Sequence, residues 1–245
     1  MRTKKSFLEN KEKEHNFNAF DVINIMVFIG VLAAFMISFV FSIYNIINTE
    51  NKSFVPVVEA ILGIVALILP FTIKKIFKIS YPKLATIFYY LFLFISIFLG
   101  SCINLYNKFA FWDIIVNFIG AILIGFLSLF FLNLYNKKPS KSLNPFLIFL
   151  FVFIFSLAFG VILEVFEFVG DLLFGLNLQE YLNSVGETLS GQKALFDTMF
   201  DLLTNLCGAF ISALICLVCS YINKDFITKF KITKIRKEKI SQIEE

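Results

Sequence analysis

The sequence predicts an all-α polytopic membrane protein with six transmembrane helices and both termini in the cytoplasm. The 245-residue chain is 58% hydrophobic and only 16% charged, whereas soluble domains average about 45–50% apolar and ~25% charged residues. The apolar residues gather in six separate runs, each close to the ~20 residues that a helix needs to cross a bilayer. The basic residues lie between these runs in an alternating pattern. These observations exclude an ordinary soluble enzyme, a disordered chain and a secreted disulfide scaffold.

The six apolar runs define an expected transmembrane domain over residues 22–222. They cover residues 22–47, 54–73, 84–105, 111–134, 145–169 and 198–222. The strands of a membrane barrel would instead be short and alternating, so helices are expected. The first run is too long for a signal peptide, and Pro70 is expected near the end of the second helix, because proline breaks a helix interior. Residues 1–21 and 223–245 are expected to be charged cytoplasmic tails.

Basic residues predict the orientation of the helices. All but three of the 22 lysines and arginines fall in the two tails and in the second and fourth loops, the exceptions being Lys52, Lys108 and Lys193. Cytoplasmic loops carry an excess of lysine and arginine, so both tails are placed inside. More than half of the 18 acids fall in the opposite, external half. The modest net charge of +4 therefore conceals a basic inner side and an acidic outer side.

Acidic and amide side chains recur on one face of each of the last three expected helices. Side chains three or four residues apart share a helix face, and this spacing groups Asp113 with Asn117, Glu164 with Glu167, and Asp197 with Asp201 and Asn205. Because successive helices alternate in direction, the three faces are expected to meet at one depth in the outer leaflet. Gln192 and Glu59 are secondary candidates for the same site.

Two interpretations compete for these acids. Asp113 and Asp197 lie where their helices are expected to begin, and an aspartate there caps free N–H groups and suits the helix dipole. Glu164 and Glu167 lie near the C-terminal end of their helix, where the dipole disfavours negative charge, and Asp201 lies a turn inside the last helix. Ionisable residues within a membrane are costly and mark functional sites. We therefore expect Glu164, Glu167 and Asp201 to bind a cation, with help from the other two aspartates.

The available donors predict which cation this would be. The single histidine, His15, lies in the N-terminal tail, and no cysteine has zinc-like spacing with the carboxylates. Oxygen donors suit Mg²⁺, Mn²⁺ or Ca²⁺, whereas Zn²⁺ favours nitrogen and sulfur. A divalent cation, Mg²⁺ or Mn²⁺ rather than Zn²⁺, is therefore the expected cofactor, and no other is indicated.

The order of these motifs matches a known pattern. Phe111-Trp112-Asp113 leads to Asn117 and Gly120, Glu164-Val165-Phe166-Glu167-Phe168 follows, and Gln192 precedes Asp197, Asp201 and Gly208-Ala209. This arrangement resembles the YjdF-type predicted inner-membrane proteins, a family of unestablished function, and more distantly the VanZ-like proteins linked to glycopeptide-antibiotic resistance. The family has a histidine where this chain has Asn117, and a Gly-Asp pair where this chain has Lys193-Ala194. If that histidine binds metal or moves protons, the chemistry here is lost or altered.

Three functions are compatible with this pattern. The first is an external, cation-dependent site that binds or acts on lipid or glycolipid head groups of the cell envelope. The second is a cation or small-solute transporter, and the third is a non-catalytic structural or resistance-associated protein. The sequence leaves open whether the protein is an enzyme. Membrane lipids are the expected partners, and the lysine-rich C-terminal tail is expected to bind anionic lipids rather than nucleic acid.

The long connection over residues 170–196 has two interpretations. Its leucine-rich start is compatible with an interfacial or re-entrant helix above the acids, and the alternative is an ordered loop.

Overall fold

The computed structural model confirms an all-α protein with six helices that are long and apolar enough to cross a membrane. It describes residues 19–48, 55–80, 82–109, 111–135, 143–175, 177–183, 185–230 and 233–234. Residues 1–18 of the predicted N-terminal tail, the lysines at 137, 138 and 141, Lys52 and most of the C-terminal tail lie outside these residues, whereas residues 19–21 of that tail begin the first helix.

Each expected span corresponds to a long helix. The six are α2 (Ala19–Asn48), α3 (Val55–Phe77), α4 (Lys83–Leu93) continued by the π-helix η1 (Phe94–Cys102), α6 (Trp112–Tyr135), α7 (Pro145–Phe174) and α8 (Gln192–Ile222). Short elements complete the chain: α5 (Leu105–Lys108), the 3₁₀-helix η2 (Phe226–Phe230), and the paired strands β1 (Ile79–Ser80) and β2 (Thr233–Lys234).

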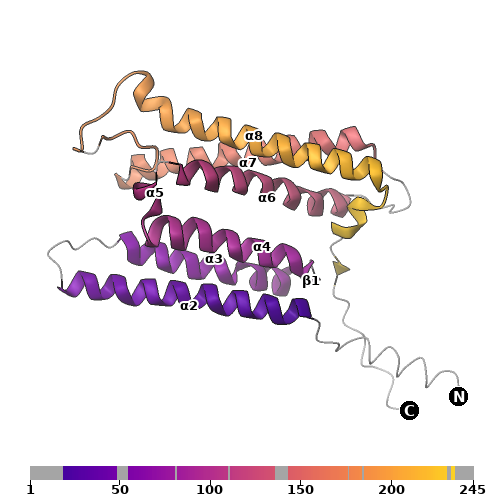
Figure 1. Cartoon of the computed structure of the whole chain (residues 1–245), viewed down its shortest axis with the longest axis horizontal. Coiled ribbons are helices and arrows are strands. Elements are labelled where there is room, and N and C mark those ends of the chain that lie inside the picture. The colour runs from indigo at the N-terminus through magenta and orange to yellow at the C-terminus, as the bar shows by residue number, and fades with distance from the viewer. Residues whose placement is uncertain are drawn as a thin grey trace, which may run out of the picture.

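The helices form two groups of three (Figure 1). The N-terminal trio consists of α2, α3 and α4 with η1, and the C-terminal trio consists of α6, α7 and α8. Contacts of α6 with α4 and η1 join the two groups. Successive long helices run in opposite directions, so the beginnings of α6 and α8 lie at the same end of the molecule as the end of α7 (Figure 1).

The two trios are packed by different means. Large side chains fill the N-terminal trio, where Phe35, Leu67 and Tyr90 are completely buried. In the C-terminal trio the backbones approach closely: a Cβ atom on Gly208 of α8 would lie 2.7 Å from the carbonyl oxygen of Phe118 on α6. Ser156 Oγ on α7 donates a 2.6 Å hydrogen bond to the carbonyl oxygen of Ala121 on α6. Small residues permit this approach between membrane helices.

Large apolar side chains cover the outside of the bundle. Ile37, Val40, Val58 and Ile162 are examples on three helices, and each is exposed. Soluble monomers rarely expose contiguous apolar surface of this extent. The surface is therefore that of helices surrounded by lipid.

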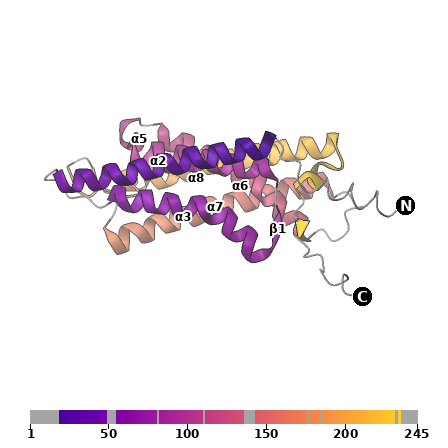
Figure 2. The same ribbon diagram turned by 90° about the horizontal axis from the view of Figure 1, so that it is seen from below.

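Two helices differ from the simple expectation of straight spans. Pro70 lies inside α3 rather than near its end, and α3 bends in its C-terminal part (Figure 2), as proline removes a helix hydrogen bond and clashes with the preceding turn. The third span changes from α-helix to π-helix at Phe94 and ends at Cys102. A hydropathy pattern carries no information on such a change in hydrogen bonding.

The last two spans are longer than their apolar runs. α7 continues past residue 169 to Phe174, and α8 begins at Gln192 rather than at residue 198. Polar residues such as Lys193 and Asp197 end the apolar run, but they do not end the helix, because helix hydrogen bonds are made by the backbone.

The opposite end of the bundle is closed by the segment that follows α8. Asn133 Nδ2 on α6 donates a 2.6 Å hydrogen bond to the carbonyl oxygen of Ile227 in η2. Beyond η2, β2 pairs in antiparallel fashion with β1, with Ile79 opposite Lys234 and Ser80 opposite Thr233. Because β1 joins α3 to α4, this pairing links the end of the C-terminal trio to the N-terminal trio.

Candidate cation site

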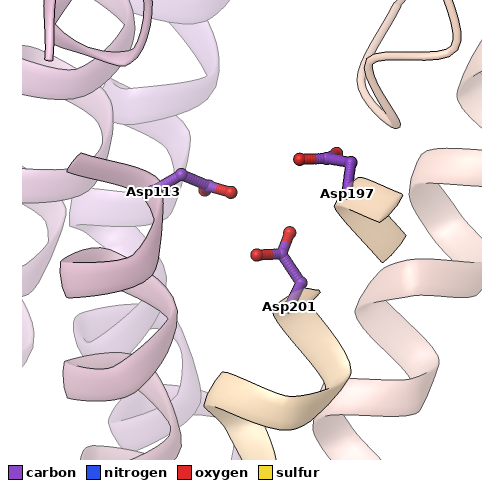
Figure 3. Close-up of side chains that lie close together, drawn as sticks. All are labelled: Asp113, Asp197 and Asp201. Atoms are coloured by element: carbon purple, nitrogen blue, oxygen red, sulfur yellow. The ribbon is translucent and has the colours of Figure 1, made fainter. Parts of the chain in front are cut away.

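Carboxylates gather where α6 begins, α7 nears its end and α8 begins. Figure 3 shows Asp113 on one helix facing Asp197 and Asp201 on another, with all three carboxylates directed into the space between them. The helices are α6 and α8. The spacing of four residues places Asp197 and Asp201 on the same face of α8, as expected from the helix period.

The acids form two triads that share one residue. Asp113, Asp197 and Asp201 form the first, and Glu164, Glu167 and Asp201 form the second. In each triad, one carboxylate oxygen from every residue lies within 4.8 Å of the others. Asp201 is therefore the centre of these five acids, the carboxylate cluster.

Burial makes this arrangement costly. Asp201 is only 3% exposed and Glu164 only 7%, and the Oε2 atom of Glu164 is buried without a hydrogen-bond partner. The carboxylates of Asp113 and Asp201 are also close neighbours, with oxygens that lie within 4.8 Å of each other. Two carboxylates at this separation repel each other unless a proton or a cation lies between them.

Lysine and arginine do not neutralise the cluster within the described part of the chain. The ion pair found there joins Lys83 to Asp21, in the N-terminal trio. Lys108, which is nearby in sequence, donates its Nζ hydrogen bond to the carbonyl oxygen of Ile103 instead. Lys193 is exposed and forms no ion pair with a described residue.

Two asparagines adjoin the cluster. Asn117 Nδ2 donates a 3.3 Å hydrogen bond to Asp113 Oδ1, one turn earlier on α6. Asn205, one turn beyond Asp201 on α8, is 3% exposed, and its Nδ2 has no hydrogen-bond partner among the described residues. Its side chain lies against Gly160, where an added Cβ would be 3.1 Å from Nδ2. The side-chain amide of Asn205, one helical turn from the centre of the cluster, is therefore available to donate a hydrogen bond.

Gln192 and Glu59 do not join either triad. Gln192 is the exposed first residue of α8, and Glu59 belongs to α3 in the other trio. The sequence could not exclude Glu59, because hydropathy does not determine which helices are neighbours. It could not exclude Gln192, because the apolar run does not show where α8 begins.

Tyr106 is a neighbour of the cluster that the sequence did not indicate. Burial raises the pKa of its hydroxyl group, and the negative charges of Asp113, Glu167, Asp201 and Glu59 raise it further. The hydroxyl therefore stays protonated within the electric field of the acids. Its ring packs on Gly100 of η1, so its position depends on the π-helix, which no spacing rule anticipates.

Asp171 has a structural role next to the cluster. Its carboxylate accepts hydrogen bonds from the backbone N–H groups of Leu178 (2.7 Å) and Gln179 (3.0 Å). Gln179 Nε2 then donates a 2.9 Å hydrogen bond to Thr198 Oγ1 on α8. These bonds fix the α7–α8 connection to both helices. Its described residues form turns and a bridge between Leu182 and Thr188, so the ordered loop, rather than an interfacial helix, is the correct alternative.

The helix ends revise the interpretation of individual acids. Asp113 does lie in the first turn of α6, where its charge suits the dipole. Asp197 is not a cap, because α8 begins at Gln192 and Gly191 is its N-cap residue. The dipole does not act against Glu164 and Glu167 either, since α7 continues to Phe174 and the effect is confined to the last turn. Burial among like charges, rather than a helix end, distinguishes these acids.

Comparison with known proteins places the chain in a family. No solved structure matches it. It is 29% identical over 151 residues, which are 59% of this chain and 67% of the other, to an uncharacterized protein of Thermotoga maritima. The family model described as "Predicted membrane protein (DUF2238)" matches residues 26–221, nearly the whole transmembrane bundle and all five acids of the carboxylate cluster. Likeness to a membrane-protein family is thereby confirmed, and the chain belongs to the DUF2238 family of predicted membrane proteins.

Proposed function

We propose that the carboxylate cluster holds a divalent cation, Mg²⁺ or Mn²⁺, and that the protein uses it to bind or act on phosphate-bearing head groups of envelope lipids or glycolipids. The observation that carries this proposal is the pair of triads sharing the buried Asp201. A divalent cation would remove the repulsion among these acids. It would also give Glu164 Oε2, which has no hydrogen-bond partner, a positive charge to coordinate.

The donor atoms favour a hard cation. Both triads offer only carboxylate oxygens, which suit Mg²⁺ and Mn²⁺, whereas zinc sites in proteins usually include histidine or cysteine. A cation held there would neutralise phosphate charge or activate a water molecule. The Tyr106 hydroxyl, kept protonated beside the acids, would donate a hydrogen bond to a bound anionic group.

The depth of the cluster favours a lipid head group as the ligand. α7 and α8 contain 30 and 31 residues, so each is about 45 Å long, well beyond the ~30 Å hydrocarbon core. The cluster lies toward one end of these helices, since Glu164 is ten residues before the end of α7 and Asp201 is nine residues after the start of α8. The distribution of basic residues supports an external position for this end.

The interior of the C-terminal trio argues against transport. Beyond the cluster, Ser128 and Ser212 donate hydrogen bonds to carbonyl groups of their own helices, and Ser156 donates to Ala121. Leu129 and Val152 are fully buried in the apolar core that follows. The described part of this trio thus offers no polar route through the membrane, which favours a surface site over a transport pathway.

Cation binding by the purified full chain tests the proposal. We expect Mn²⁺ to raise the melting temperature of the protein, because a ligand that binds only the folded state stabilises it. The double variant Glu164→Gln/Asp201→Asn should lose this response and weaken Mn²⁺ binding at least about tenfold, measured by electron paramagnetic resonance titration. Asp225→Asn, at the opposite end of α8, is the matched control and should behave as the unmodified protein.

The same experiment separates the cation site from a purely structural cluster. If the acids only organise the helices, Mn²⁺ will leave the melting temperature of the unmodified protein unchanged, while the double variant alters it with or without the metal. An unchanged Mn²⁺ response in the double variant would show that the ligands lie elsewhere.

A further inference from the structure

A second polar site lies at the opposite end of the molecule, in the N-terminal trio. A cavity of about 240 Å³ opens there between α2, α3 and α4. Its lining includes Asp21, Asn24, Phe28, Phe71, Lys74 and Lys83. None of these residues belongs to the carboxylate cluster, so the cavity is a separate site.

The bend of α3 accounts for the cavity. Phe71 and Lys74 follow Pro70 directly, in the part of α3 that turns away from its earlier course (Figure 2). On the other side, α2 and α4 are held together by the Asp21–Lys83 ion pair and by a 3.2 Å hydrogen bond from Asn24 Nδ2 to the carbonyl oxygen of Lys83. The space is therefore built into the backbone.

The inner wall of the cavity is aromatic. The ring of Phe28 meets Phe71 edge-on at a centroid distance of 5.2 Å and Tyr90 at 5.6 Å. Tyr90 is completely buried. Such a wall gives the cavity a fixed shape and an apolar face.

The polar part of the lining carries net positive charge. It contains two lysines and one aspartate, and the aspartate is paired with Lys83. Lys74 lines the cavity and forms no ion pair with any described residue. Lysine is an established phosphate ligand in proteins.

We propose that this cavity binds one phosphate group, carried either by an anionic lipid head group or by a free phosphate ester. Lys74 supplies the charge, Lys83 and Asn24 supply further donors, and the aromatic wall contacts the carbon part of the ligand. The volume far exceeds the ~10–15 Å³ that one water molecule needs. It is smaller than the ~300–1,000 Å³ of typical small-molecule sites, which fits a head-group fragment rather than a whole organic ligand. Basic pockets between membrane helices at the inner face bind such head groups.

Lipid retention by the purified full chain tests this site. The protein is exchanged into phosphatidylcholine nanodiscs with and without phosphatidylglycerol, and bound phosphatidylglycerol is counted by native mass spectrometry after release. We expect Lys74→Gln to lower the retained phosphatidylglycerol about tenfold or more, because a charge-assisted hydrogen bond is lost. Lys74→Arg should preserve it. Lys75→Gln is the matched control, since Lys75 is the next residue of α3 and does not line the cavity.

Competition identifies the source of the phosphate. Inorganic phosphate and glycerol 3-phosphate are added to the phosphatidylglycerol nanodiscs. Displacement at micromolar concentration supports the site with a free phosphate ester as its ligand, and resistance to displacement supports it with a lipid. Equal retention by Lys74→Gln and unmodified protein overturns the proposal, as does an equal loss in Lys75→Gln, which would indicate only diffuse attraction to basic residues. The carboxylate cluster is untouched by these variants, so failure here leaves the cation proposal standing.

Discussion

Asp201 is the residue on which the candidate cation site depends. It belongs to both triads and is almost fully buried, and the two triads bring acids from three different helices to it. The helical period allowed the sequence to group Asp197 with Asp201 and Glu164 with Glu167. It could not predict Tyr106 or Asp171 in their present roles, because one depends on a π-helix and the other on the conformation of a loop.

Asn117 offers a test of the donor set at the residue scale. It is bonded to Asp113 and stands where the resembling family has a histidine. Asn117→His would add an imidazole nitrogen beside carboxylates, and zinc favours such mixed sites. We expect the ratio of Zn²⁺ to Mn²⁺ affinity, measured by competition titration, to rise about tenfold. Asn117→Gln, which adds no ring nitrogen, should leave the ratio unchanged, and an equal ratio in both variants would place residue 117 outside the metal's coordination shell.

At the scale of helices, the C-terminal trio is held by close backbone approach. The sequence identified all six long helices, since apolar length is sufficient for that purpose. The lengths predicted for α7 and α8 are too short, because polar residues end an apolar run without ending a helix. The bend in α3 and the π-turns of η1 were also missed, although both shape the places where ligands are proposed to bind.

Gly208 tests the closeness of α6 and α8. A Cβ added there would lie 2.7 Å from the Phe118 carbonyl oxygen and 2.8 Å from Ala121 Cβ, so the helices must separate. We expect Gly208→Ala to lower the free energy of unfolding by about 1–3 kcal/mol, measured by denaturant titration in detergent. Gly30→Ala is the control, since no atom lies within 4 Å of its added Cβ, and it should be neutral or slightly stabilising. Equal effects of the two changes would contradict the close packing.

At the scale of the whole molecule, the two proposed sites lie at opposite ends of the bundle. The carboxylate cluster belongs to the C-terminal trio and the basic cavity to the N-terminal trio. The alternation of helices was predictable from the sequence, because each helix that crosses the membrane places the next loop on the opposite side. The division into two trios was not, since every span is similarly apolar.

Labelling with a membrane-impermeant thiol reagent tests the orientation. In a variant with the four native cysteines replaced by alanine, Val185→Cys lies in the α7–α8 loop and Lys224→Cys follows α8, and both positions are exposed. The positive-inside rule predicts that Val185→Cys reacts in intact cells and that Lys224→Cys reacts only after permeabilisation. The reverse pattern would place the carboxylate cluster on the cytoplasmic side.

The pairing of β1 with β2 has a consequence for the biogenesis of the protein. Residues 79–80 leave the ribosome early, but their partners at 233–234 are synthesised only after α8. The N-terminal trio is therefore inserted in the membrane before β1 can pair with β2, and this pairing forms only after the last helix has been inserted. Pairing of β2 with β1 would then be the last step of assembly. A chain truncated before residue 233 would lack this contact between the two trios.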